Sequence, residues 1–113
     1  MSKLKIVFLG TPEIACGFLR RIAASGHEVI GVVSQPDRPV GRGLKLSCAP
    51  VNALAGELRF KTFKPASKAE LHEVISLLKP DLAVVVAYGR LIPPETLALA
   101  RFGFLNVHFS LLP

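Results

Sequence analysis

The chain has 113 residues, of which 50% are hydrophobic and 19% are charged. This length allows one domain with a sizeable core, and the composition excludes a disordered chain. No apolar run reaches the roughly 18 residues that a membrane span needs, and a net charge of +6 favours polyanionic partners only where that charge is clustered.

The amino-terminal residues 1–10 could pass for a short secretory signal. Their apolar part is too short, and Thr11-Pro12-Glu13 is not a cleavage site, so we predict a cytoplasmic protein. Both cysteines, Cys16 and Cys48, lack a C-x-x-C partner and are expected to be free, mostly buried thiols.

The first predicted element is a strand over Leu4–Leu9, whose continuous apolar run is typical of a strand that is buried on both faces. Gly10 makes the turn, Thr11 is a candidate N-cap, and Pro12 suits the first helical position. The helix should run to about Ser25, with a buried face made by Ile14, Phe18, Leu19 and Ile22.

A second strand is predicted over Val29–Ser34, and the stretch 35–46 follows it. This stretch is dense in Pro, Gly and Arg, so we expect no regular structure, and its length points to a function. It carries the cations Arg38, Arg42 and Lys45. It is either a loop that contacts phosphate backbones or an ordinary solvated loop.

The rest of the chain continues the alternation of helices and strands. A short helix starts at Pro50, and a third strand covers Phe60–Phe63. Ser67 and Glu70 form a capping box for the next helix, on which His72 should lie at the surface. The remaining predictions are a strand over Leu82–Ala87, a loop over 88–92, a short helix that Pro93-Pro94-Glu95 starts and that covers Thr96 to about Ala100, and a strand over Phe102–Phe109.

This order predicts an α/β fold, a Rossmann-like doubly wound parallel sheet with strand order 3-2-1-4-5. Ligands of such sheets bind beyond the carboxyl ends of the strands. The turn after the first strand is not G-x-G-x-x-G, and no acid follows the second strand, so an NAD site is disfavoured.

The fifth strand carries the best chemical candidates. We read it as a buried strand in which Asn106, His108 and Ser110 share one face. The amide of Asn106 and the imidazole of His108 lie about 6–7 Å apart along it, which suits holding a carbonyl oxygen while it becomes an oxyanion. The alternative is a structural pair that neighbouring loops satisfy. No carboxylate is placed to orient His108, because Asp81 lies at the wrong edge of the sheet.

Four segments together resemble the methionyl-tRNA formyltransferase family, and the resemblance covers the whole chain. They are Gly10-Thr11-Pro12, the basic stretch from Ser34 to Gly43, Val86 to Pro93, and the N-x-H-x-S-L-L-P run from Asn106 to Pro113. The last is shared by folate-dependent formyltransferases and related hydrolases. The basic stretch is therefore the segment that distinguishes methionyl-tRNA formyltransferases from those other enzymes.

The resemblance implies formyl transfer from 10-formyltetrahydrofolate to the amino group of initiator methionyl-tRNA, with no metal. Asn106 would bind the formyl oxygen, and His108 would stabilise the tetrahedral intermediate. Arg42, supported by Arg38 and Lys45, would contact the tRNA acceptor end, although Leu44 stands where the family often has a further cation. The folate pocket would comprise Tyr88, Gly89, Arg90, Leu91, Ile92, Ser110, Leu111, Leu112 and Pro113.

Members of that family are longer, with a catalytic Asp after the S-L-L-P segment and a carboxyl-terminal β-barrel. We therefore expect 1–113 to be the amino-terminal portion of a formyltransferase domain, truncated after the fifth strand and inactive by itself. Two alternatives remain open. One is another folate-dependent formyltransferase, such as one that acts on a nucleotide sugar, and the other is a non-catalytic tRNA-binding module.

Overall fold

The computed structural model describes residues 3–40 and 45–108, except the side chains of Val40 and Lys45. Its centre is a five-stranded sheet in the order β5-β2-β1-β6-β7, and every pairing in it is parallel. The strands are β1 (Lys5–Gly10), β2 (Glu28–Val33), β5 (Thr62–Phe63), β6 (Leu82–Val86) and β7 (Phe104–Val107). These are the five predicted strands, so the order 3-2-1-4-5 is confirmed.

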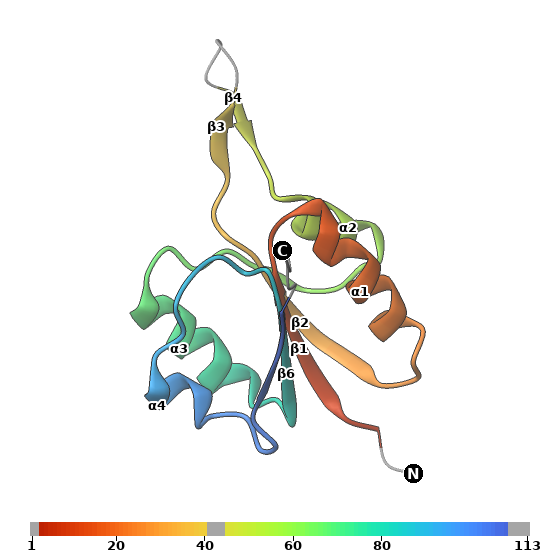
Figure 1. Cartoon of the computed structure of the whole chain (residues 1–113), viewed down its shortest axis with the longest axis vertical. Helices are drawn as coiled ribbons and strands as arrows, with labels where there is room; N and C mark the ends of the chain where they lie inside the picture. The colour runs from red at the N-terminus through yellow and green to blue at the C-terminus, as the bar shows by residue number, and fades with distance from the viewer. Residues whose placement is uncertain (1–2, 41–44, 109–113) are drawn as a thin grey trace, which may run out of the picture.

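The helices cover both faces of this sheet (Figure 1). On one face lie α1 (Glu13–Ala23) and α2 (Pro50–Glu57), and on the other lie α3 (Lys68–Leu78) and α4 (Pro94–Leu97). The core is correspondingly divided, because alternate side chains of β1 enter different layers. Ile6 and Phe8 join the first layer, while Val7 and Leu9 join the second. Each of these side chains contributes about 1.5–3 kcal/mol by leaving water, which explains the continuous apolar run.

The start of α1 differs from the prediction. The N-cap is Pro12 and no side chain caps the helix. The hydroxyl of Thr11 instead donates to the carbonyl oxygen of Tyr88 at 2.8 Å. Ile14 is 56% exposed, and the small residues Ala15 and Cys16 face the sheet in its place. A small side chain is needed there because β1 and α1 approach closely where Gly10 ends the strand.

The prediction that 35–46 has no regular structure was wrong. β3 (Arg38–Val40) and β4 (Lys45–Ser47) form an antiparallel pair in which Arg38 lies opposite Ser47. This β3–β4 hairpin projects beyond the sheet in Figure 1. Proline argues strongly only against central strands, whereas both strands of a two-stranded ribbon are edges, so Pro39 is tolerated.

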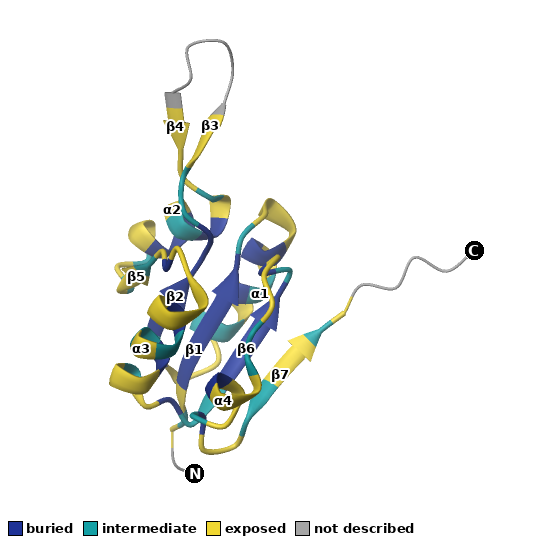
Figure 2. Cartoon of the chain, turned by 90° about the vertical axis from the view of Figure 1, so that its left-hand side faces the viewer, coloured by how far each residue is buried: buried dark blue, intermediate teal, exposed yellow. Residues whose placement is uncertain are grey.

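The fifth strand is shorter and more exposed than we expected. Within the described residues β7 pairs only with β6, and both Leu105 and Asn106 are exposed, so it is not a buried strand (Figure 2). Three smaller predictions also need correction. His72 is half-buried and hydrogen-bonded to Thr96, Cys48 is exposed, and α4 ends at Leu97, before its predicted end at about Ala100. Both cysteines are free, as predicted.

Candidate active site at the carboxyl ends of the strands

Four polar segments follow strands of the parallel sheet and meet at its carboxyl edge. They are Thr11-Pro12 after β1, Ser34–Arg38 after β2, Ala87–Ile92 after β6, and Asn106–His108 at the end of β7. In Figure 2 the arrows of β1, β6 and β7 point toward this edge, from which the β3–β4 hairpin also rises. Asp81 lies at the opposite edge, where its carboxylate accepts from the Lys5 amide at 2.9 Å.

Asn106 and His108 line one cavity of about 430 Å³, which lies between the end of β7 and the segment 85–91. We call it the β7 cavity. Asn106 pairs with Val85 of the neighbouring strand, and both polar residues are exposed to solvent. An amide donor and an imidazole on one wall can hold a carbonyl oxygen that gains negative charge. Among the described residues, no carboxylate lines this cavity.

The opposite wall of the β7 cavity is a tight turn after β6. Ala87 and Gly89 both have left-handed backbone angles, with φ 52° and 86°. Tyr88 lies between them with its ring buried in the core. Burial raises the pKa of the Tyr88 phenol above its usual value, and the Arg90 charge opposes this shift. Unusual backbone angles of this kind are found where surrounding contacts hold a functional turn in place.

The peptide groups after this turn are available to a ligand. None of the hydrogen bonds within the described residues uses the backbone of residues 89–92. The carbonyl of Tyr88, by contrast, already accepts from Thr11 and Gln35. The free peptides at 89–92 therefore offer both donors and acceptors at the rim of the cavity, which suits a planar heterocycle with a hydrogen-bonding edge.

A second cavity of about 430 Å³ lies on the hairpin side of the same turn. We call it the hairpin cavity. Its walls come from the turn after β1, from the base of the β3–β4 hairpin and from the start of α2. Ala87 and Gly89 line both cavities, so the turn after β6 forms a shared wall.

The structure locates only part of the predicted basic cluster. Arg38 is exposed at the base of the hairpin, where its guanidinium donates to the side-chain oxygen of Gln35. Lys45 lies in β4, but its side chain is outside the described residues, as is all of Arg42. The predicted folate residues Ser110, Leu111, Leu112 and Pro113 also lie outside the described part.

Sequence reasoning missed the role of Thr11 and Gln35 in this site. We expected Thr11 to cap a helix and assigned nothing to Gln35. Both donate to Tyr88, although the sequence separation is 77 residues for Thr11 and 53 for Gln35. No local pattern reports a partner that far away along the chain.

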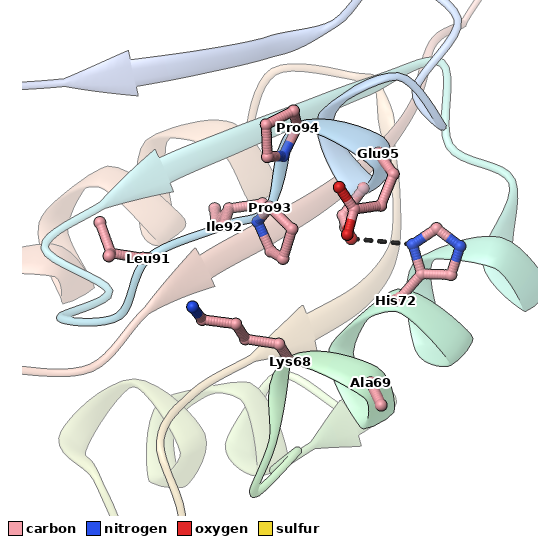
Figure 3. A pocket seen from close by; sticks show the side chains of 9 residues that line it. Lys68, Ala69, His72, Leu91, Ile92, Pro93, Pro94 and Glu95 are labelled. Carbon is pink, nitrogen blue, oxygen red and sulfur yellow. Dashed lines mark hydrogen bonds between the residues drawn. The ribbon is translucent and has the colours of Figure 1, made fainter.

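A third cavity, of about 620 Å³, does not contain the predicted catalytic pair. It lies between α3 and the segment 91–96, and Figure 3 shows its lining. The dashed line there is the 2.8 Å hydrogen bond between His72 and Thr96. Most of its lining is aliphatic or proline, and Lys68 extends along one side of the space. It adjoins the β7 cavity through Leu91, which lines both.

Metal-ligand clusters and membrane-spanning helices are both absent from residues 3–40 and 45–108. No group of three or more His, Cys, Asp or Glu side chains there could hold a metal ion. No helix in that part of the chain is long and apolar enough to cross a membrane.

The amino-acid sequence of this chain is similar to those of known proteins. A sequence profile of the family described as Formyl transferase matches residues 4–113. The methionyl-tRNA formyltransferase of Methylococcus capsulatus is 50% identical over 112 residues, which is 97% of this chain and 36% of that protein. The methionyl-tRNA formyltransferase of Geobacter sulfurreducens is 48% identical over 115 residues, which is 100% of this chain and 36% of that protein. The chain thus spans about a third of the length of these relatives.

Two solved structures resemble this fold. A glycinamide ribonucleotide transformylase from Symbiobacterium toebii superposes with a TM-score of 0.71 at 20% identity, covering 98% of this chain and 54% of that one. A phosphoribosylglycinamide formyltransferase from Brucella melitensis has a TM-score of 0.68 at 26% identity, covering 99% of this chain and 60% of that one. The first likeness concerns the fold alone.

Proposed function

This chain belongs to the formyl transferase family, and from that membership we propose that it works as the amino-terminal part of a methionyl-tRNA formyltransferase in translation initiation. The formyl donor is 10-formyltetrahydrofolate, and the acceptor is the amino group of methionine on initiator tRNA. The observation that carries the proposal is the β7 cavity next to a basic hairpin, where Asn106 and His108 share the lining with peptide groups that have no hydrogen-bond partner among the described residues. Such an enzyme would act in the cytoplasm.

The chemistry assigns a role to each wall of the β7 cavity. The methionine amine attacks the formyl carbon, whose oxygen becomes an oxyanion. The new carbon–nitrogen bond replaces the bond to N10 of the folate, and the proton lost by the amine is balanced by the one that N10 gains. Asn106 donates to the developing oxyanion, and His108 stabilises the same intermediate. The backbone of Gly89–Ile92 holds the edge of the pterin ring.

The β3–β4 hairpin is the feature that favours a tRNA acceptor. Arg38 and Lys45 belong to its two strands, and Arg42 lies between these strands in the sequence. A hairpin that projects from the site can reach the phosphates of a large substrate, whereas a nucleotide sugar needs no such extension. A non-catalytic tRNA-binding module would need the hairpin but would have no use for Asn106 and His108 in a cavity.

A chimera tests the proposal as a whole. Residues 1–113 of this chain replace the matching 36% of the Geobacter sulfurreducens relative. The chimera should formylate initiator methionyl-tRNA and should leave nucleotide amino sugars unmodified. The 113-residue chain without the added segments should show no transfer, because no carboxylate lines the β7 cavity in its described part. Transfer by the isolated chain would contradict this assignment.

Two substitutions in the chimera separate catalysis from tRNA binding. His108→Ala should lower kcat by about a hundredfold to a thousandfold, since it removes a group that stabilises the intermediate, and should leave tRNA affinity unchanged. Arg42→Ala should weaken tRNA binding much more than folate binding, and should reduce the slope of log affinity against log salt by about 1.

The matched control for Arg42→Ala is Arg21→Ala, which removes the same charge from the last turn of α1, away from the carboxyl edge. It should change neither affinity. Equal losses of tRNA and folate binding in Arg42→Ala would overturn the assignment of the hairpin. Full activity in His108→Ala would overturn the catalytic role of His108, whereas tRNA binding that survives His108→Ala, with no folate affinity, would favour the binding-module alternative.

A further inference from the structure

The carbonyl oxygen of Tyr88 receives two side-chain donors from other parts of the chain. Gln35 donates through Nε2 at 2.9 Å, and Thr11 donates through its hydroxyl at 2.8 Å. Gln35 is only 7% exposed, so its amide is largely withdrawn from water. A buried amide keeps its position only when its polar atoms are paired, and both ends of this one are.

Arg38 determines which way the Gln35 amide points. A guanidinium can only donate, so the side-chain oxygen of Gln35 faces Arg38 and the nitrogen faces Tyr88. The base of the β3–β4 hairpin is thereby connected, through one amide, to the turn after β6. We use the name clamp for the bonds that join Arg38, Gln35, Thr11 and the Tyr88 carbonyl.

Gly89 leaves space for the clamp because it has no side chain. A Cβ atom at position 89 would lie 2.2 Å from Nε2 of Gln35, so the Gln35 amide would have to move away from its present position. The backbone of Gly89 also has φ 86°, which favours glycine. The absence of a side chain therefore lets the amide of Gln35 approach the peptide between residues 88 and 89.

The peptide that the clamp holds belongs to the shared wall of the two cavities. Ala87 and Gly89 line the β7 cavity, which contains Asn106 and His108, and they also line the hairpin cavity. A shift of this wall would move the groups that bind the two substrates relative to each other. Small errors in such geometry have large kinetic effects, because the reacting atoms must be aligned at close range.

We propose that Gln35 is a positioning residue for formyl transfer, which fixes the wall between the β7 cavity and the hairpin cavity by donating to Tyr88. This inference rests on the proposed function. Gln35 touches no reacting atom in it, and its contribution is made through the Tyr88–Gly89 peptide. The competing explanation is that Gln35 only stabilises the fold.

The substitution Gln35→Glu distinguishes these two explanations in the chimera. A carboxylate still accepts from Arg38 but cannot donate to the Tyr88 carbonyl. Protonation restores the donor, so the kcat of Gln35→Glu relative to the unsubstituted chimera should rise as pH falls. Gln35→Leu removes the donor at every pH, and its relative kcat should stay low throughout. We expect kcat to fall by about tenfold to a hundredfold in both variants at neutral pH, with smaller changes in KM.

The control is Asp81→Ala, which removes a comparable side-chain-to-backbone bond at the opposite edge of the sheet. It should lower stability and leave kcat unchanged. If both Gln35 variants keep the kcat of the unsubstituted chimera per folded molecule, the inference is overturned while the proposed function stands. If the unsubstituted chimera transfers no formyl group, the proposed function and this role for Gln35 fall together.

A second measurement tests the clamp without any assay of activity. In the 113-residue chain, nuclear magnetic resonance should show a side-chain amide proton of Gln35 that exchanges with water at least about tenfold more slowly than that of a free glutamine, because it is buried and bonded. Exchange at the rate of a free amide would show that the clamp is not formed and would overturn the inference.

Discussion

Tyr88 contributes its ring to the core and its carbonyl oxygen to the hydrogen bonds of the candidate site. Its ring is buried in the layer beneath α3, while its carbonyl oxygen accepts from Thr11 and Gln35. The ring therefore anchors the turn, and the two donors orient the peptide that follows. Burial raises the pKa of its phenol above the usual 10.0, with the Arg90 charge acting in the opposite direction.

This pKa shift predicts a loss of stability in alkali. The proton is held more tightly in the folded state, so the contribution is complete below pH 10 and is lost as pH rises through the folded-state pKa. The free energy of unfolding should fall with rising pH in that window, and Tyr88→Phe should remove this part of the decline. Denaturant titrations of both proteins at a series of pH values measure the difference.

The same prediction has a direct spectroscopic check, because the chain contains one tyrosine. The ultraviolet absorbance of tyrosinate should appear with a midpoint above 10.0 in the folded chain, and at its usual value in denaturant. A folded-state midpoint at or below 10.0 would contradict the prediction.

At the scale of single elements, the glycines of β1 and α1 differ in the space around them. Gly10 lies where the two elements approach, and a Cβ atom there would be 2.8 Å from the carbonyl oxygen of Val86. Gly17 lies on the exposed side of α1, and a Cβ atom there would meet nothing within 4 Å. The same chemical change should therefore have opposite effects at these two positions.

Gly10→Ala should lower the free energy of unfolding by about 1–3 kcal/mol, because backbone atoms would have to move to admit the methyl group. Gly17→Ala should raise it by about 0.5–1 kcal/mol, because alanine restricts the unfolded chain and favours helix. Equilibrium unfolding in urea measures both. If the Gly17→Ala variant were less stable than the original chain, position 17 of α1 would not be exposed as described.

For the whole molecule, the notable surface is the edge formed by β7. Within the described part of the chain this strand has one neighbour, and Leu105 is 56% exposed on it. An exposed apolar edge strand offers unpaired peptide groups to another chain. The 113-residue chain should therefore self-associate through β7 as its concentration rises.

Leu105→Lys should reduce this association, because a charge on an edge strand opposes strand addition. Leu77→Lys is the matched control, since Leu77 is 75% exposed on α3, away from the edge, and the substitution adds the same charge. Sedimentation velocity over a range of concentrations compares the three proteins. Equal reductions by both substitutions would indicate a general effect of charge and would exclude β7 as the contact.

The features of this protein that depend on local patterns could be predicted from the order of its residues alone. The apolar run of β1 indicated a strand that is buried on both faces, and the alternation of strands and helices was enough for the order 3-2-1-4-5. The polar residues of the fifth strand could be placed at the carboxyl edge for the same reason, since parallel strands end together.

Contacts between distant segments depend on tertiary packing and could not be predicted from local patterns. β3 pairs with β4, although Pro and Gly had argued against regular structure there, and the Thr11 hydroxyl donates to Tyr88 in place of capping a helix. Tertiary packing also brings the amide of Gln35 to a residue 53 positions away. Helix and strand periods repeat within a few residues and can be read from one segment, whereas a hydrogen bond between segments depends on where the packed core places both of them.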